Sequence, residues 1–366
     1  MIREFASALL LTQNLIFDEF RQVLEGKIDA ERVHYAELFA DREIVEAILA
    51  DYMGHTPVPS PEDDFEDYWR QQIEYWHKMG YDYIRVAGGL EIPRAKHRTT
   101  GDTAELSRGE RNWIEQGIGE IASWKDFEAY PWQTVRDMDF AAYEFVSQNL
   151  PDGMKMLVCP SSGVFEISSE YMLGFEGMSI MLYEDPELME AVFDRVGQML
   201  LDFYRNVVTM ENVAGIFQGD DLGFKTSTFL SPAHLRKLVF PWHARYAQLT
   251  HERGQVYWLH SCGNLHNVID DLIDDVGIDA IHSFQDEIVP VGDFKEQYGH
   301  RVAVLGGIDV DKLCRMDEAS LRSYVRTTID RCMPRGWALG SGNSIANYVP
   351  VRNFLIMMDE GARWSR

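Results

Sequence analysis

Short apolar runs that end in glycine or small polar residues recur along the chain. Seven of them lie at residues 81–89, 154–163, 213–223, 256–264, 279–287, 302–310 and 337–345. Each places a few β-prone residues before turn formers, which is typical of strands buried on both faces of a parallel sheet. Residues 31–39 offer an eighth strand.

Amphipathic helical patterns separate these runs. Residues 185–207, 231–254, 264–277 and 317–336 each keep apolar side chains on one face. Ser231-Pro232 is typical of a helix start and Gly277 of a helix end. The alternation predicts an α/β fold, a (β/α)8 TIM barrel, with an open doubly wound sheet as the alternative.

Two segments depart from the alternation. Near the N-terminus a short apolar stretch, residues 8–11, is interrupted by polar residues, which predicts an amphipathic helical extension and not a signal peptide. Residues 91–140 are rich in Trp, Arg and Gly and read as an insertion or lid over the barrel mouth. We expect a single domain over residues 1–366.

The composition disfavours several classes of binding partner and cellular location. The formal net charge of -25 disfavours nucleic acid and strongly acidic substrates. No window is apolar for long enough to span a membrane, and four scattered cysteines are too few for a disulfide framework. We expect a cytoplasmic protein, and a homodimer is one assembly that the sequence allows.

Polar side chains gather where the predicted strands end, and in a barrel these carboxyl ends carry the chemistry. They are Gln218, Asp220, Asp221, His260, Cys262, His282, Gln285, Ser341 and Asn343. Asp220 and Asp221 are candidates for metal ligands or a general acid, with helix capping as the alternative. Together the strand ends predict a polar pocket, and nearby aromatic residues such as Trp258 suit a flat substrate.

His260 and Cys262 stand two residues apart at the end of one predicted strand. Residues at this spacing point to the same face of a strand. Imidazole and thiolate are preferred zinc ligands, so the pair predicts a metal site at the mouth. The alternative is a core histidine beside a buried thiol.

At "HSCGN" (260–264), "LYEDPELM" (182–189) and "GSGNSIANYVP" (340–350) the sequence resembles the uroporphyrinogen decarboxylase superfamily. The resemblance implies a (β/α)8 barrel. The decarboxylase branch holds its polycarboxylate with an arginine-rich segment of R-Q-A-G-R type, whereas this chain has "RVHYAELFADRE" at residues 32–43. The resemblance therefore favours the other branch, the corrinoid-dependent methyltransferases. These include the methylcobamide:coenzyme M enzymes and the methyltransferase components of O-demethylase systems.

In the coenzyme M enzymes of that branch, H-x-C and a later cysteine in a G-C-G segment hold zinc. His260 and Cys262 match the first part, but Asn343 stands in place of the second cysteine, and Gln285 is the nearest match to an acidic residue near the zinc. One thiolate leaves a harder centre that prefers oxygen. We therefore expect zinc, or an acid such as Asp220 or Asp221, to activate a methoxy oxygen.

The expected reaction is O-demethylation: a methyl group passes from a small methoxylated molecule, such as an aryl methyl ether, to a corrinoid (cobalamin) on a separate corrinoid protein. Asp220, Asp221 and Gln285 are the predicted catalytic residues. The predicted substrate-binding residues are Gln218, His282, Ser341, Asn343 and Trp258. The alternatives are a cofactor-independent decarboxylase of uroporphyrinogen type and a non-catalytic corrinoid or substrate carrier.

Overall fold

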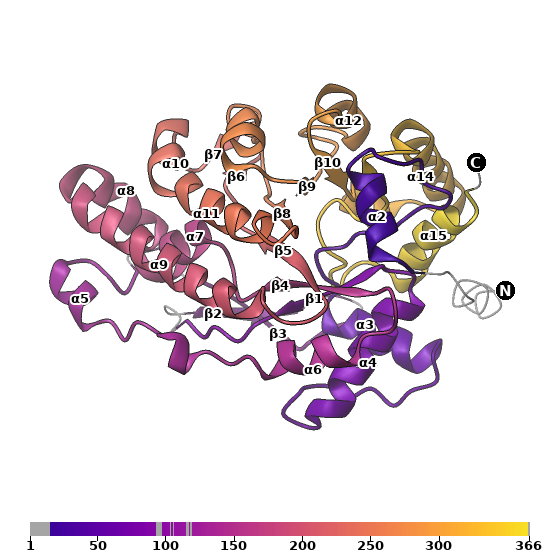
Figure 1. Ribbon diagram of the computed structural model, residues 1–366, viewed down its shortest axis with the longest axis horizontal. Coiled ribbons are helices and arrows are strands. Elements are labelled where there is room, and N and C mark those ends of the chain that lie inside the picture. Colours follow the sequence, from indigo (N-terminus) through magenta and orange to yellow (C-terminus); the bar gives the residue numbers. More distant parts are fainter. Residues whose placement is uncertain are drawn as a thin grey trace.

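A curled sheet of seven parallel strands forms the centre of the computed structural model, which describes residues 15–92, 97–102, 104, 106–114, 117 and 119–364. The strand order is β1-β4-β5-β8-β9-β10-β11 (Figure 1). The strands are β1 (Tyr83–Ala87), β4 (Lys155–Cys159), β5 (Val213–Gly219), β8 (Val256–His260), β9 (Ala280–His282), β10 (Ala303–Leu305) and β11 (Trp337–Ala338). Each of the seven predicted runs supplies one strand, which confirms the predicted α/β architecture.

The predicted eighth strand, residues 31–39, meets the sheet at its far edge. Isolated parallel bridges join Tyr35 to Leu339 and Ala40 to Ile345. The amide of Ala36 donates to the carbonyl of Leu339 over 2.8 Å, and the amide of Leu339 donates to the backbone carbonyl of His34 over 2.8 Å. Within the described residues no backbone ladder joins this segment to β1, so the established architecture is a curled half-barrel extended by these bridges.

Two predicted helices form as expected and two are altered. Residues 185–207 and 317–336 give α9 (Pro186–Val207) and α14 (Glu318–Cys332). Residues 231–254 divide into α10 (Pro232–Leu238) and α11 (Phe240–His251), because Pro241 lacks an amide donor and starts a new first turn. Residues 264–277 supply only the π-helix η3 (Asp271–Val276), which ends at Gly277 with φ of 80°.

The other helices complete the layers around the sheet. They are α3 (Arg42–Asp51), α4 (Phe65–Lys78), α6 (Ala141–Asn149), α7 (Val164–Glu166), the π-helix η2 (Ile167–Leu173), α8 (Phe175–Glu184), α12 (Val291–Tyr298), α13 (Val310–Arg315) and α15 (Val351–Ala362). Within the described residues, no helix has both the length and the apolar character that crossing a bilayer requires.

The predicted insertion, residues 91–140, contains the antiparallel hairpin β2 (His97–Gly101) and β3 (Glu110–Ile114). The helix α5 (Trp124–Ala129) and the 3-10 turn η1 (Val135–Asp137) follow it. A second, smaller hairpin, β6 (Gly223–Phe224) and β7 (Ser227–Thr228), follows β5. Residues 93–96, 103, 105, 115, 116 and 118 of the insertion lie outside the described residues.

Aromatic side chains fill the lower interior of the sheet. Tyr83, Phe217 and Trp258 meet edge to face, with ring centroids 5.5 Å apart for Tyr83 and Trp258 and 5.6 Å apart for Phe217 and Trp258. Below them, the helix α2 (Phe17–Leu24) inserts Phe17 and Phe20. Part of the predicted N-terminal extension is thus observed, while residues 1–14 lie outside the described residues.

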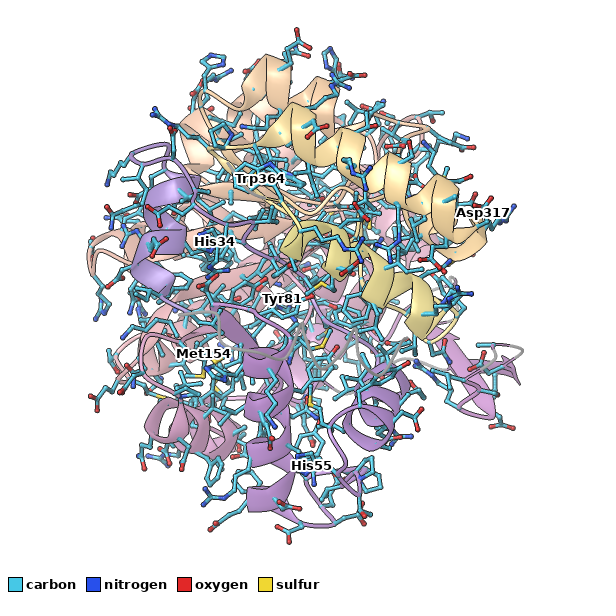
Figure 2. All side chains as sticks on the ribbon, turned by 90° about the vertical axis from the view of Figure 1, so that its right-hand side faces the viewer. His34, His55, Tyr81, Met154, Asp317 and Trp364 are labelled. Atoms are coloured by element: carbon cyan, nitrogen blue, oxygen red, sulfur yellow. The ribbon has the colours of Figure 1, made fainter. Side chains whose placement is uncertain are left out.

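The two ends of the described chain lie on the same side of the molecule (Figure 1). Figure 2 shows this side: His34 lies beside α2, and Trp364 lies beside the C-terminal helices α14 and α15. His34 stacks on Phe20 with ring centroids 4.9 Å apart. Residues of the first described segment therefore close the interior at the amino ends of the strands, and the carboxyl ends of the strands form the open face.

Candidate metal centre

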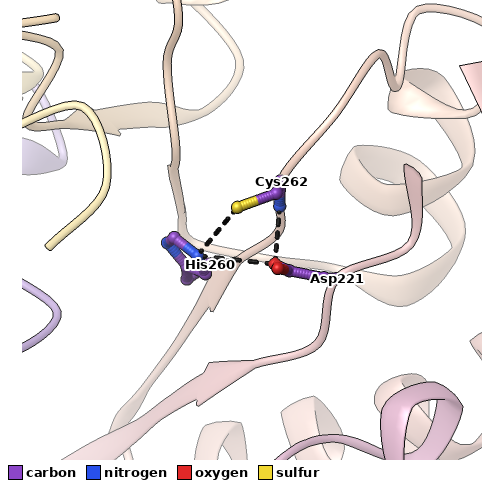
Figure 3. A group of neighbouring side chains, drawn as sticks. All are labelled: Asp221, His260 and Cys262. Carbon is purple, nitrogen blue, oxygen red and sulfur yellow. Dashed lines mark hydrogen bonds and ion pairs between the residues drawn. The ribbon is translucent and has the colours of Figure 1, made fainter. Parts of the chain in front are cut away.

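Asp221, His260 and Cys262 converge at the carboxyl ends of β5 and β8 (Figure 3). His260 is the last residue of β8, and Cys262 follows two residues later. Nε2 of His260 lies 3.5 Å from Sγ of Cys262 and 3.5 Å from Oδ1 of Asp221. The backbone amide of Cys262 donates to the same Oδ1 over 2.8 Å, which fixes the carboxylate beside the two other side chains.

These separations fit a tetrahedral zinc ion. Zinc bonds of about 2.0–2.3 Å at tetrahedral angles place neighbouring ligand atoms about 3.4–3.6 Å apart. Both distances measured from Nε2 of His260 are 3.5 Å, and the three ligand atoms all lie within 4.8 Å of one another. One nitrogen, one sulfur and one oxygen ligand leave a fourth position, the composition of a catalytic zinc site. The residues present therefore fit the ion that the sequence predicted.

His282 fixes the tautomer of His260. Nε2 of His282 lies 3.2 Å from the carbonyl oxygen of Ser341, which can only accept, so this nitrogen carries the proton. Nδ1 of His282 then accepts from Nδ1 of His260 over 2.7 Å. Burial is the main cause that lowers the pKa of His282 well below its usual value, and it keeps the ring neutral. The lone pair of His260 is thereby left on Nε2, toward Cys262 and Asp221.

Two neutral donors surround the sulfur of Cys262. Nδ2 of Asn343 lies 3.2 Å from Sγ, and Oγ of Ser283 lies 3.6 Å from it. Ser283 holds φ at 102°, a strained value for a residue with a side chain, and such strain is concentrated at functional sites. Burial and the charge of Asp221 raise the pKa of the thiol to about 12, so a cation is needed to hold it as a thiolate.

The pKa values of the two acidic side chains at this position are shifted in opposite directions. Burial opposes ionisation of Asp221, but its contact with His260 and the amide of Cys262 lower the pKa of its carboxyl overall. Burial and then the charge of Asp221 raise the pKa of Glu166 well above its usual value. A cavity of about 260 Å³ opens beside them and is lined by Asp221, His260, Asn343, Glu166 and Arg85, among others.

Asp220, predicted as catalytic, points away from this cavity. Its carboxylate accepts the backbone amides of Phe165 (3.0 Å) and Glu166 (2.9 Å) at the start of α7, and Nε2 of His243 lies 2.8 Å from it. The side chain is fully buried and all its partners are structural. The capping alternative considered for Asp220 is thus the one that the geometry favours.

Strand alternation explains why three other predicted residues lie elsewhere. Gln218 points out of the sheet, toward the hydroxyl of Tyr204, because the side chain of the preceding residue, Phe217, points inward. Trp258 faces inward, but it lies below the cavity, packed in the aromatic cluster with Tyr83 and Phe217. Gln285 is exposed in the turn after β9 and does not line the cavity. Gln218, Trp258 and Gln285 therefore do not line this cavity, and their substrate-binding and catalytic roles stay predictions.

The remaining predicted residues divide into two groups. Asp221, His260, Cys262 and Asn343 meet at the site. His282 and Ser341, predicted to bind substrate, lie behind His260, where Ser341 also donates from its amide and hydroxyl to Glu37 over 2.6 and 2.5 Å. They support the site from behind and do not line the cavity.

Cavity residues that sequence reasoning missed include Glu166, Arg85, Ser161 and Ser162. Glu166 follows the "CPSSG" turn after β4, and the turn itself contains no acidic residue that would mark this strand end. Arg85 lies inside the apolar run of residues 81–89. A charge at an inward position of a buried strand is costly, so Arg85 was itself a detectable signal.

Comparison with known proteins places this fold. The family model described as uroporphyrinogen decarboxylase (URO-D) matches residues 140–364. A search of curated proteins gave no match. Among solved structures, a methyltransferase from Methanosarcina mazei is similar with a TM-score of 0.62 at 14% identity, covering 93% of this chain and 96% of that one. A putative vitamin-B12 independent methionine synthase from Listeria monocytogenes gives a TM-score of 0.47 at 12% identity, covering 92% and 98%. The likeness to the first structure concerns the fold, and the match of the family model over more than half of the residues shows that the chain belongs to the uroporphyrinogen decarboxylase family.

Proposed function

We propose that the protein is a methyltransferase that moves a methyl group from a small methoxylated molecule to a corrinoid on a partner protein. The observation that carries the proposal is the convergence of Asp221, His260 and Cys262 beside a cavity at the strand ends. The methyltransferase-type fold agrees with it. The proposal includes a closed barrel, in which residues 34–36 stand as the eighth strand beside β11.

In this proposal Asp221, His260 and Cys262 hold zinc, and Asp221 takes the third position that sequence reasoning left between several residues. Zinc in this setting supplies Lewis acidity toward an ether oxygen. Asn343 is not needed as a ligand, because its amide donates to the sulfur of Cys262 and disperses the thiolate charge. His282 keeps the lone pair of His260 turned to the ion.

The remaining residues of the cavity orient the donor. Glu166 lines the cavity without being needed as a ligand. Its carboxyl accepts a hydrogen bond from the backbone of Asp221, and its other oxygen can hydrogen-bond the oxygen that leaves when the methyl group departs. We assign this role to Glu166 in place of Asp220, whose oxygens are occupied by two amides and His243. The methyl group is then held at the open end of the strands, where the corrinoid of a partner protein would approach.

The test combines metal analysis with methyl transfer. Protein purified without chelator should contain about one equivalent of zinc, and His260→Ala should lose it. Methylation of a cob(I)alamin-loaded corrinoid protein, followed by absorbance across a panel of methoxylated donors, should occur with the wild type and not with His260→Ala. Zinc content below about a tenth of an equivalent in both proteins would remove the metal role. Turnover of uroporphyrinogen without a corrinoid would favour the decarboxylase instead.

A further inference from the structure

An arginine side chain lies inside the curled sheet, on the wall of the cavity formed by β1. Arg85 is half-buried and, like Tyr83 two residues earlier, faces inward. Its Nε donates to the carbonyl oxygen of Phe217 over 2.9 Å, and its guanidinium carbon lies 5.8 Å from the centre of the Phe217 ring. This contact uses one of the five N–H donors of the guanidinium. The other donors are available to the cavity that Arg85 lines.

The lack of an acidic partner distinguishes Arg85 from other poorly exposed arginines. Arg32 pairs with Asp82, and Arg322 pairs with Asp359 and Glu360. Within the part of the chain that the structure describes, no ion pair involves Arg85. Removing a guanidinium from water without a counter-charge costs free energy. A bound anion would supply the missing counter-charge.

Two hydroxyl groups border the same cavity. Ser161 and Ser162 follow β4, the strand that pairs with β1, and both residues line the cavity with Arg85. The backbone carbonyl of Ser161 accepts from Gln218 and Cys159, but no hydrogen bond of either hydroxyl is found among the described residues. An arginine fork beside free hydroxyls is a suitable arrangement for binding an oxyanion.

We propose that Arg85, with Ser161 and Ser162, binds a carboxylate group of the substrate, so that the methyl donor is a small methoxylated carboxylic acid. The identity of this acid as a methyl donor rests on the proposed function, whereas carboxylate binding at Arg85 does not. The cavity of about 260 Å³ is smaller than the range typical of drug-sized ligands and suits a molecule of this size. With its carboxylate at Arg85, the rest of such an acid would occupy the cavity that Asp221 and His260 also line.

The test measures how strongly small ligands protect Arg85 from phenylglyoxal, an arginine-modifying reagent, with peptide mass spectrometry as the readout. The probes are 3-methoxybenzoate, its neutral analogue 3-methoxybenzamide, inorganic phosphate and methanesulfonate. Arg352, exposed on α15 and paired with Glu318, is the internal control in the same sample. The experiment is run on zinc-loaded and zinc-free protein, so that failure of the metal proposal leaves the result readable.

We expect 3-methoxybenzoate to protect Arg85 at a concentration about tenfold or more below that of the amide, with Arg352 unaffected. Arg85→Gln should in parallel bind the acid and the amide equally in calorimetry. An unreactive Arg85, equal protection by acid and amide, or an acid preference that persists in Arg85→Gln would overturn the proposal. Protection by phosphate or methanesulfonate alone would overturn the carboxylate and identify another oxyanion.

Discussion

At the scale of single residues, the candidate site depends on which ring nitrogen of His260 carries the proton. The carbonyl oxygen of Ser341 can only accept, so His282 must donate from Nε2, and His260 must in turn donate from Nδ1. The carbonyl of Ser341 thus determines the tautomer of His260 through two successive hydrogen bonds, with His282 between them. Partners of this kind contribute to metal affinity without touching the ion.

Replacement of His282 tests this arrangement. His282→Leu removes the acceptor for Nδ1 of His260, so zinc affinity should fall by a factor of about 10 to 100. His282→Gln, which retains a donor and an acceptor, should recover part of the loss. Competition with a chromophoric chelator gives the affinities. If His282 were only a packing residue, urea unfolding would change in His282→Leu while zinc affinity stayed at the wild-type level.

At the scale of elements, the turn after β5 sends two adjacent carboxylates in different directions. Asp220 caps α7 and contacts His243 in the helix layer, whereas Asp221 faces the cavity. The turn thereby joins a helix start to the candidate site. Substitutions of these two residues therefore test the stability of the fold and the affinity of the site for metal separately.

Asn substitution at each position should give opposite results. Asp220→Asn leaves His243 and an amide of α7 without a charged acceptor in a buried place, so the free energy of unfolding should fall by about 2–4 kcal/mol. Asp221→Asn keeps an acceptor for the amide of Cys262, so the unfolding free energy should change by less than about 1 kcal/mol while zinc affinity drops. Urea titration and chelator competition measure both quantities. Equal losses of unfolding free energy in the two variants would contradict this division.

Strand phase also explains how much could be predicted from the sequence. Seven strands were evident, because runs buried on both faces read as continuous apolar stretches. Such runs do not reveal which residues point inward, so Gln218 was assigned to the pocket although it faces the helices. His260 and Cys262 could be predicted because two metal-binding side chains stand two residues apart, a spacing that places both on the same face of a strand. Asp221 was also predicted, but its position beside them depends on the parallel pairing of β5 with β8, which the sequence does not reveal.

At the scale of the whole molecule, the N-terminal segment and the last strand are joined at Ser341. Glu37 accepts the amide of Ser341 over 2.6 Å and its hydroxyl over 2.5 Å, across 304 positions in the sequence. The carbonyl of the same serine accepts from His282. Contact between the chain ends is therefore continuous with the residues that orient His260. Weakening that contact should affect the stability of the whole fold.

The pH dependence of unfolding tests this contact. Burial raises the pKa of Glu37 to about 8, while the hydrogen bonds from Ser341 act in the opposite direction. The folded protein therefore holds this proton more tightly than the unfolded chain does. The stabilisation is complete below about pH 4.5, the ordinary pKa of glutamate, and is lost as pH rises toward 8, by up to about 1.4 kcal/mol per pH unit.

Glu37→Gln imitates the protonated carboxyl at every pH. Its free energy of unfolding should match that of the wild type near pH 5 and exceed it increasingly up to about pH 8, beyond which the difference should be constant. Urea titrations of both proteins at several pH values measure the difference, and Glu184→Gln, at an exposed position at the end of α8, serves as the control. A difference that does not change with pH would mean that Glu37 is ionised in the folded protein. The join between the chain ends would then depend on a buried charge, and Glu37→Gln should weaken it at every pH.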